Sequence, residues 1–451
     1  MTHSGFIFLV MVKLFATFFL ILSTGLYIAF SQDNQTLRYH AHRQEIYIGA
    51  AVNNVFFNVS SGHIYSRTLH EEFNMLVAEN AMKFGPMRPQ PGVFNFTSSD
   101  HLIDFAQEHQ MTPRGHALIW HNQLPQWVNE GEFTRDSLLS VMEEHITKVV
   151  GRYKGIIREW DVVNEAIDMG EEDNFRRTLF YNVIGPEYID SAFVYAHRAD
   201  PEAFLFYNDY SADQVNGKSN RIYDMVEGML NNGIPIHGVG LQGHFVLGQI
   251  NHSSIDQNIK RFGELGVLVN FTEIDIRIPA ALFYDDQAWA EQGSQYRNLL
   301  QVCLDNDNCT SFVMWGFTDR YSWIPGFTNG NYGQALILDN NYQPKPAYFE
   351  LLDLLSEGYD FPAAANDSPF ENWNIFPNPA VDYITISGVP ERDSITLKLY
   401  DMQGRLWSEQ KKSFAGRARM SLQGMPAGIY ALRIITADGK TLTKLIHKTR
   451  L

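Results

Sequence analysis

Cysteine and positive charge are both scarce in this chain. Only two cysteines occur among its 451 residues, which excludes a zinc site built from four cysteines. Lysine and arginine number 35 against 51 aspartates and glutamates, for a net charge of −16. An acidic protein is poorly suited to nucleic acid or to an anionic membrane, so we expect a neutral partner and no nucleic acid. The pattern of residues predicts neither a metal nor a cofactor.

One long apolar run stands at the N-terminus. Lys13 precedes the apolar residues 14–30, and Ser31-Gln32 then offers a suitable cleavage point. A basic residue, an apolar core and small or weakly polar residues in this order are typical of a secretory signal peptide, predicted here at residues 1–31. An uncleaved anchor helix is the alternative, which the small and hydroxyl-bearing residues inside the run weaken.

Short β-rich runs recur along the next three hundred residues. They are Ile46–Val52, Met75–Glu79, Arg114–Trp120, Ile157–Glu165, Phe204–Tyr210, Gly238–His244, Val267–Asp275 and Cys309–Phe317. Segments such as Ser137–Tyr153, Ser219–Asn231 and Gln287–Leu304 lie between them, with apolar residues at helical spacing. Continuous apolar runs are typical of parallel strands buried on both faces. The alternation predicts an α/β fold, a (β/α)8 TIM barrel over residues 32–357.

Polar residues collect at the carboxyl ends of these runs, the face on which barrel active sites are built. They are Glu79, Asn80, His116, His121, Asn164, Glu165, Asn208, Asp209, Gln242, His244, Glu273 and Asp275. A single polar residue at a strand end is often only a satisfied structural residue. A whole set at the same end of successive strands predicts an active site.

Glu165 and Glu273 each close one of these runs. A carboxylate at the mouth of a buried strand costs solvation free energy unless it has a partner or a function. Glycoside hydrolysis needs two carboxylates: one protonates the leaving oxygen, and the other attacks the anomeric carbon or activates water. Asn164 is placed to hold a sugar 2-hydroxyl. His244 and Asp275 are placed to orient and ionise Glu273.

Aromatic residues accompany this set. They are Trp120, Trp127, Trp315, Tyr321 and Trp323. Flat rings stack well on the apolar faces of pyranose sugars. The alternative for each ring is a place in the hydrophobic core, which is least expected for Trp323 in its loop.

Cys303 and Cys309 enclose five residues rich in Asp and Asn. In an exported protein such a pair favours a small-loop disulfide, and two free buried thiols are the alternative.

The composition changes after Glu357. Residues 358–371 are rich in Pro and Ala, as in a linker. Residues 372–451 then carry 12 Lys and Arg against 6 Asp and Glu. Apolar and polar residues alternate there in Tyr383–Ser387, Thr396–Tyr400 and Ile429–Ile435. This pattern predicts a small all-β sandwich as a second domain.

The barrel region resembles glycoside hydrolase family 10, the family of retaining endo-β-1,4-xylanases. The resemblance runs from about Gly49 to Leu355 and rests on many segments that occur in order. They are Glu79–Lys83, Gly115–His121, Trp160–Glu165, Asn208–Tyr210, Gly240–His244, Thr272–Asp275, Trp315–Asp319 and Pro344–Tyr348. Phe84-Gly85 depart from the pattern, because the family usually has a Trp and an acidic residue there.

The resemblance implies a role for each matching residue. Glu165 matches the acid/base and Glu273 the nucleophile of a double displacement. The sugar two sites toward the non-reducing end would be held by Glu79, Asn80 and Lys83. The cleavage subsite would be lined by His116, Trp120, Asn164, Gln242 and His244, with Asp275 supporting the nucleophile. Aromatic walls would be formed by Trp315 and Trp323.

On this resemblance we expect a secreted, monomeric endo-1,4-β-xylanase that acts on xylan and xylo-oligosaccharides. Two other functions stay open. One is a different retaining β-glycanase on the same kind of barrel, which would lack a pocket that rejects a 6-hydroxymethyl group. The other is a non-catalytic glycan-binding barrel, which the intact pair of glutamates argues against.

The last domain resembles the sorting domains of proteins exported by type IX secretion in Bacteroidota. The matching segments are Phe376–Ala380, Leu399–Gly404, Met425–Tyr430 and the basic end Lys444–Lys448. The resemblance implies contact with the type IX secretion machinery and export through the outer membrane. A carbohydrate-binding module is the alternative, but the domain has few aromatic residues from which to build a sugar platform.

Overall fold

The structure is a computed structural model in which the chain forms two compact units, residues 1–358 and 359–451. It describes residues 36–357, 374–376, 380, 382–389, 394–401, 406–413, 416–426, 428–436 and 441–448. The predicted signal peptide and linker, residues 1–31 and 358–371, lie outside the described residues. Within the described part of the chain, no helix is long and apolar enough to cross a membrane.

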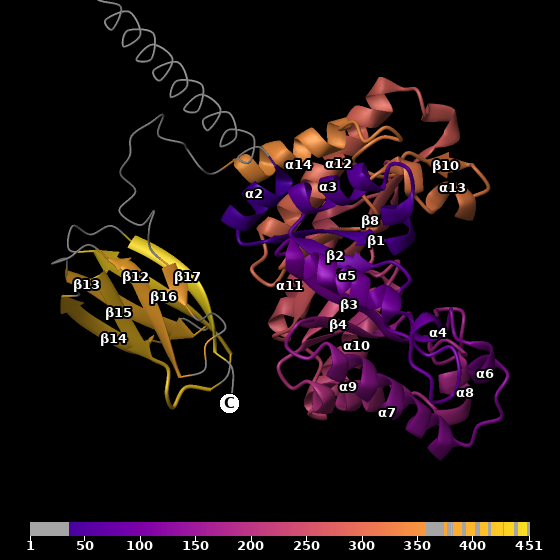
Figure 1. Ribbon diagram of the computed structural model, residues 1–451, viewed down its shortest axis with the longest axis horizontal. Helices are drawn as coiled ribbons and strands as arrows, with labels where there is room; N and C mark the ends of the chain where they lie inside the picture. The colour runs from indigo at the N-terminus through magenta and orange to yellow at the C-terminus, as the bar shows by residue number, and fades with distance from the viewer. Residues whose placement is uncertain are drawn as a thin grey trace, which may run out of the picture. The chain divides into compact units, whose positions relative to one another are not determined.

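The first unit contains a closed barrel of parallel strands, which confirms the predicted fold (Figure 1). In barrel order the strands are β1 (Tyr47–Val52), β2 (Met75–Ala78), β3 (Thr112–Trp120), β4 (Glu159–Asn164), β5 (Phe204–Asp209), β6 (Gly238–Leu241), β8 (Leu268–Pro279) and β9 (Ser311–Met314). β9 pairs with both β8 and β1, and this pairing closes the barrel. Two short strands, β7 (His244–Val246) and β10 (Tyr332–Gly333), pair with β8 outside the closed ring.

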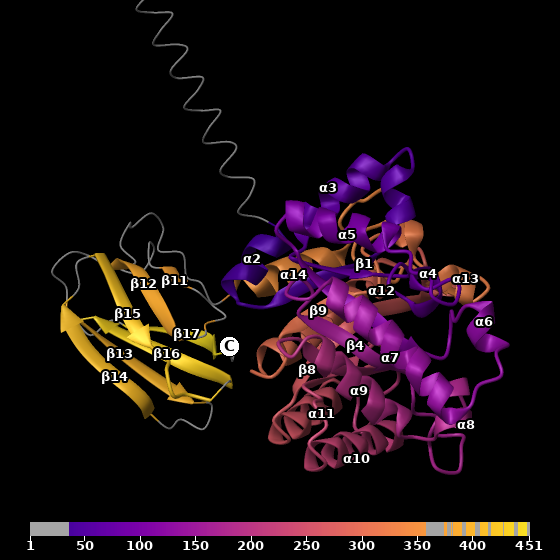
Figure 2. The same cartoon turned by 60° about the horizontal axis from the view of Figure 1, so that its bottom comes forward.

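Helices surround the strands (Figure 2). The longer ones are α2 (Leu37–Arg43), α3 (Gly62–Glu72), α5 (Thr97–Glu108), α7 (Arg135–Arg152), α9 (Tyr188–Ala199), α10 (Gly217–Asn231), α11 (His252–Glu264), α12 (Asp286–Leu304) and α14 (Pro346–Ser356). Short helical turns are η2 (Asn54–Asn58), α4 (Phe84–Met87), α6 (Gln126–Asn129), α8 (Leu179–Ile184), η3 (Ala280–Leu282), η4 (Asp319–Tyr321) and α13 (Ile324–Phe327). The strands are almost entirely buried beneath this layer, as parallel strands covered on both faces must be.

The helices predicted from apolar spacing are present as α7, α10 and α12, and each begins one or two residues earlier than predicted. Their first turns are set by capping residues. Thr134 accepts a hydrogen bond from the Ser137 amide, and the Ser137 hydroxyl accepts one from the Thr134 amide. Asn216 and Ser219 form the same reciprocal cap on α10. Because the cap precedes the apolar pattern, periodicity alone places the start too late.

Several strand ends differ from the prediction, and in each case backbone conformation is the reason. β4 stops before Glu165, whose φ is +59°. The run predicted over residues 238–244 is broken at Gly243, with φ +75°, into β6 and β7. β8 continues to Pro279 instead of stopping at Asp275, because β7 and β10 pair with its extension.

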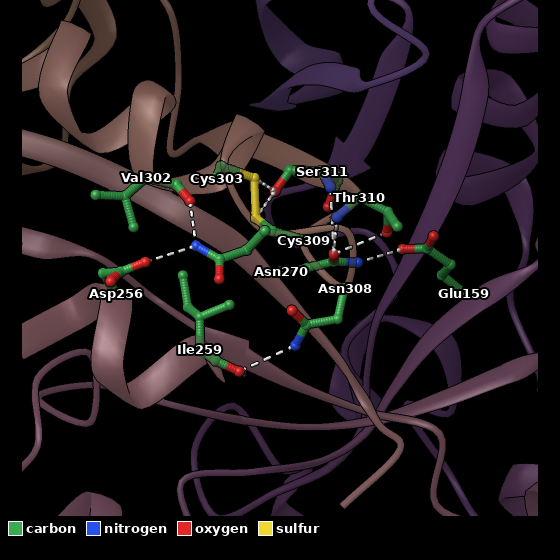
Figure 3. Close-up of a disulfide and its surroundings, with 11 residues drawn as sticks. Glu159, Asp256, Ile259, Asn270, Val302, Cys303, Asn308, Cys309, Thr310 and Ser311 are labelled. Carbon is green, nitrogen blue, oxygen red and sulfur yellow. Dashed lines mark hydrogen bonds between the residues drawn. A yellow bond between two sulfur atoms is a disulfide. The ribbon is translucent and has the colours of Figure 1, made fainter. Parts of the chain in front are cut away.

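The Cys303–Cys309 disulfide joins the end of α12 to the start of β9, with the two Cα atoms 5.1 Å apart (Figure 3). Beside it, the side-chain oxygen of Asn270 accepts hydrogen bonds from the backbone amides of Thr310 and Ser311. The Asn270 amide donates to Glu159 at 3.2 Å, so this end of β9 is tied to the charged residues inside the barrel.

The second unit is a small all-β sandwich, as predicted. Its first sheet has the order β11 (Asn374–Phe376), β12 (Tyr383–Val389), β15 (Gly416–Ser421). Its second has the order β14 (Leu406–Ser413), β13 (Ser394–Asp401), β16 (Gly428–Thr436), β17 (Thr441–Lys448). The strands named here pair antiparallel within each sheet, and side chains from both sheets, such as Ile384 and Leu397, share one apolar core.

Candidate active site

Glu273 lies on β8 and is 5% exposed. The Asn208 amide donates to its Oε1 at 2.7 Å, and His244 Nε2 lies 3.3 Å from its Oε2. His116 Nδ1 lies 3.9 Å from Oε1. Burial by itself would raise the pKa of Glu273, but His116 and the hydrogen bond from His244 outweigh it and hold that pKa below its ordinary value. Glu273 is therefore ionised although it is buried.

His244 is held between two carboxylates. Its Nδ1 lies 2.9 Å from Asp275 Oδ2, and the Trp323 indole donates to the same oxygen at 2.9 Å. Burial opposes the charged form of His244, but Asp275 and then Glu273 outweigh it and raise the pKa of His244 to about 10. His244 is therefore an imidazolium near neutral pH, and both ring nitrogens can donate.

Glu165 directly follows β4 and is partly exposed. Its Oε1 accepts hydrogen bonds from Gln242 at 3.1 Å and from Asn164 at 3.3 Å. The Asn164 side-chain oxygen accepts from Gln242 at 3.2 Å and from Asn208 at 2.9 Å. Because Asn208 also donates to Glu273, a chain of three amides joins the two carboxyl groups across the barrel mouth.

His116 is fixed by a charged network in the barrel interior. Its Nδ1 lies 3.0 Å from Asp161, and Arg114 donates to Asp161 at 2.6 Å and also to Glu159. Sequence reasoning did not include Asp161 among the site residues, and it placed Asn208 on the active-site face without giving it a role. The signals were present, because Asp161 interrupts an apolar strand and Asn208 closes one.

Glu79, Asn80 and Lys83 lie together after β2. Asn80 donates to Glu79 at 3.1 Å and accepts from Lys83 at 3.5 Å. The Lys83 ammonium lies 4.5 Å from the centre of the Trp120 ring. Burial lowers the pKa of Lys83, and neighbouring carboxylates oppose that change. Gln123, which sequence reasoning missed, donates to the Asn80 side-chain oxygen at 3.0 Å.

Two of the predicted aromatic walls border the site. Trp315 meets His116 edge-on at 5.1 Å between ring centres, and Trp323 meets His244 in the same way at 5.1 Å. Together with Glu79 and Tyr321 these tryptophans line a small hollow.

Aromatic residues also make contacts that serve the fold. The Trp127 indole donates to the Arg88 carbonyl, and Tyr321 stacks on Phe56 at 3.9 Å between ring centres. Phe84, where the sequence departs from the family pattern, is buried and stacks on His145.

The predicted site residues of the first unit therefore converge on one face of the barrel. Among the residues that the structure describes, no group of three or more His, Cys, Asp or Glu side chains is arranged to hold a metal ion. The surroundings of the two glutamates are amides, imidazoles, indoles and one ammonium, which suit proton transfer and nucleophilic attack by a carboxylate.

Two sequence profiles match the chain. Residues 36–354 match the profile described as glycosyl hydrolase family 10. The chain belongs to glycosyl hydrolase family 10. Residues 374–448 match the profile described as a secretion system C-terminal sorting domain, which directs this family 10 protein to the cell surface or the extracellular space.

Relatives within family 10 cover the same region. Endo-1,4-beta-xylanase B of Thermotoga neapolitana is 39% identical over 341 residues, which are 75% of this chain and 96% of that protein. The beta-1,4-xylanase of Dictyoglomus thermophilum is 37% identical over 318 residues, 68% of this chain and 87% of its own. Xylanase 10B from Thermotoga petrophila RKU-1, solved in complex with xylobiose, has a TM-score of 0.69 at 41% identity and covers 71% of this chain and 97% of its own.

Proposed function

We propose that this protein is a secreted endo-1,4-β-xylanase that cleaves internal β-1,4 bonds of xylan with retention of configuration. The observation that carries the proposal is the amide chain of Asn208, Asn164 and Gln242, which links Glu273 to Glu165. Two carboxyl groups held in fixed relation over one cleft are what a double displacement needs. The names of the relatives and the xylobiose complex support xylan as the substrate.

In the first step Glu165 donates its proton to the glycosidic oxygen while a Glu273 oxygen attacks the anomeric carbon. The bond to the leaving sugar breaks, and a covalent ester with Glu273 forms. Glu273 is suited to this attack because His244 and Asn208 hold it ionised and oriented. In the second step ionised Glu165 takes a proton from water, the water attacks the anomeric carbon, and Glu273 leaves as a carboxylate.

The remaining site residues position the sugars in this proposal. The sugar two sites toward the non-reducing end is held by Glu79, Asn80 and Lys83. The cleavage subsite is lined by His116, Trp120, Asn164, Gln242 and His244, and Asn164 contacts the 2-hydroxyl. The sugar faces are covered by Trp315 and Trp323.

We further propose that the mature enzyme is a monomer that has lost residues 1–31. Residues 32–357 form its catalytic domain, and residues 372–451 form the sorting domain.

Product analysis and stereochemistry test this proposal together. Purified protein is incubated with xylan, cellulose and mixed-linkage glucan, and products are sized. We expect xylo-oligosaccharides from xylan and few oligosaccharides from the glucans. Preferential release of oligosaccharides from the glucans would favour another β-glycanase.

Proton NMR in the first minutes of hydrolysis should show the β-anomer of the product first. The α-anomer appearing first would overturn the double displacement and the nucleophile role of Glu273.

A further inference from the structure

The backbone at Glu165 is unusual for a glutamate. Its φ of +59° lies in the left-handed region, which non-glycine residues adopt rarely and at a cost in free energy. Such a conformation persists only when its surroundings fix it. It also sets the direction in which the Glu165 side chain leaves the chain, so the groups that fix this backbone decide where the carboxyl points.

One of these groups is the hydroxyl of Tyr207 on β5. It accepts a hydrogen bond from the Ala166 amide at 2.9 Å and from the Ile167 amide at 3.1 Å. Tyr207 is fully buried. The next residue, Asn208, donates to Glu273 at the barrel mouth, and side chains alternate along a strand, so the Tyr207 side chain lies on the opposite face of β5.

The Tyr207 hydroxyl is itself oriented. It donates to Asp209, two residues further along the same strand face. Asp209 is fully buried and accepts a charge-assisted hydrogen bond from Lys218 at 2.6 Å. Since the hydroxyl's own proton goes to Asp209, its lone pairs face Ala166 and Ile167.

Arg176 holds the same stretch from its other side. Its Nε donates to the Glu165 carbonyl at 2.8 Å, and its Nη2 donates to the Tyr210 hydroxyl at 2.7 Å. The Glu165 amide donates to the Asn208 carbonyl at 2.9 Å. The Glu165 amide and carbonyl and the two following amides are therefore all bound, by Arg176, Tyr207 and β5.

We infer that Tyr207 and Arg176 form a backbone clamp that aims the Glu165 carboxyl at the glycosidic oxygen. Both are positioning residues, because they act on the peptide units around Glu165 and not on the sugar. This inference rests on the acid/base role proposed for Glu165. Losing the clamp should impair proton transfer while leaving attack by Glu273 intact, since Glu273 is held by a separate set of side chains.

The test uses Tyr207→Phe, which keeps the ring and removes only the hydroxyl. Tyr153→Phe is the matched control, since Tyr153 is also buried and its hydroxyl bonds to Ser99 and Asp100 on α5, away from the site. Arg176→Lys is the second variant, because it removes the Nε donor to the Glu165 carbonyl and remains informative if Tyr207→Phe does not fold.

The readout is kcat/KM on two aryl xylobiosides, one with an activated leaving group and one with a poor one. Either clamp variant should lose about tenfold on the poor leaving group, which needs the acid, and stay within about twofold on the activated one. The Tyr153→Phe control should show no such selectivity. Equal losses on both substrates, or no loss on the poor one, would overturn the clamp.

Glu165→Ala in the same assay separates the two ideas. If it selectively loses the poor leaving group while the clamp variants do not, the acid/base proposal stands and only the clamp is wrong. If Glu165→Ala itself shows no selectivity, the proposed role of Glu165 is at fault.

Discussion

Glu273 shows how single residues set the chemistry of this site. A carboxyl that is 5% exposed would ordinarily take up a proton, because burial disfavours the charged form. Here a protonated His244 and the Asn208 amide bind one oxygen each. The proposed nucleophile is thus kept charged by its neighbours, whereas Glu165 is bound through neutral amides.

Replacing Glu273 by alanine should abolish hydrolysis of every substrate, because no covalent intermediate can form. The measurement is release of the aryl group from an activated xylobioside, where assistance by the acid is least needed. Substantial residual turnover there would remove Glu273 from its role. Circular dichroism and the melting temperature would show that the variant is folded.

Glu165→Ala should behave differently over time. With an activated aryl glycoside the first step needs little protonation, so the glycosyl-enzyme forms quickly and its hydrolysis slows. A burst of released aryl group followed by a slow steady state is the expected signature. Azide, which needs no general base, should speed the slow phase of this variant. A uniform loss with no burst would contradict the role.

The pH dependence of stability reports on His244. Its folded pKa of about 10 lies above the ordinary value of 6.5, so the folded state binds its proton more tightly. This stabilisation is complete below about pH 6.5 and disappears as the pH rises through 10. The difference in melting temperature between the wild type and His244→Asn should therefore be largest near pH 6 and shrink toward pH 10. A difference that grows with pH would exclude a charged His244.

At the scale of elements, apolar runs were enough to place all eight barrel strands, because burial on both faces leaves a continuous signal. The strand ends were not predictable in the same way. After β4 the backbone around Glu165 is bound by Tyr207 and Arg176. Both residues come later in the sequence, outside β4, so the local sequence pattern could not predict these contacts. The amide chain through Asn208 was missed for the same reason, since it exists only once β4, β5 and β8 are assembled.

The disulfide element should matter for stability and not for catalysis. Changing Cys303 and Cys309 to serine removes a disulfide that closes a loop with a sequence separation of 6. The loop-closure entropy of such a disulfide stabilises the folded state by about 2 kcal/mol. The melting temperature should fall by roughly 2–4 °C, because the entropy of unfolding of a large domain is large, and kcat/KM should be unchanged.

The Asn270→Ala variant provides the contrast to the disulfide variant. This variant removes the hydrogen bond from Asn270 to Glu159. Arg114 binds both Glu159 and Asp161, and Asp161 in turn holds His116, so the variant should lower activity as well as stability.

At the scale of the whole molecule, the chain divides its tasks between two units with separate cores. Every proposed catalytic residue lies in the first unit, and the family 10 match ends at residue 354. The first unit nevertheless makes contacts with residues beyond the end of that match. Gln44 donates to the carbonyls of Leu355 and Glu357, and Arg297 pairs with Glu357, so the catalytic unit needs its residues up to 357.

A stop after Glu357 should therefore leave full activity on soluble xylan, because these contacts and α14 are kept, while the sorting domain is lost. In the native host the truncated enzyme should remain inside the outer membrane, and cell fractionation with a xylanase assay would show where it is. A truncation before Pro346 is the control that tests where the catalytic unit ends. It removes α14, whose Leu351 and Leu355 are fully buried and which packs against α12, so that shorter protein should fail to fold. If the chain ending at Glu357 still reaches the medium as readily as the full chain, without lysis, the second unit is not what exports it.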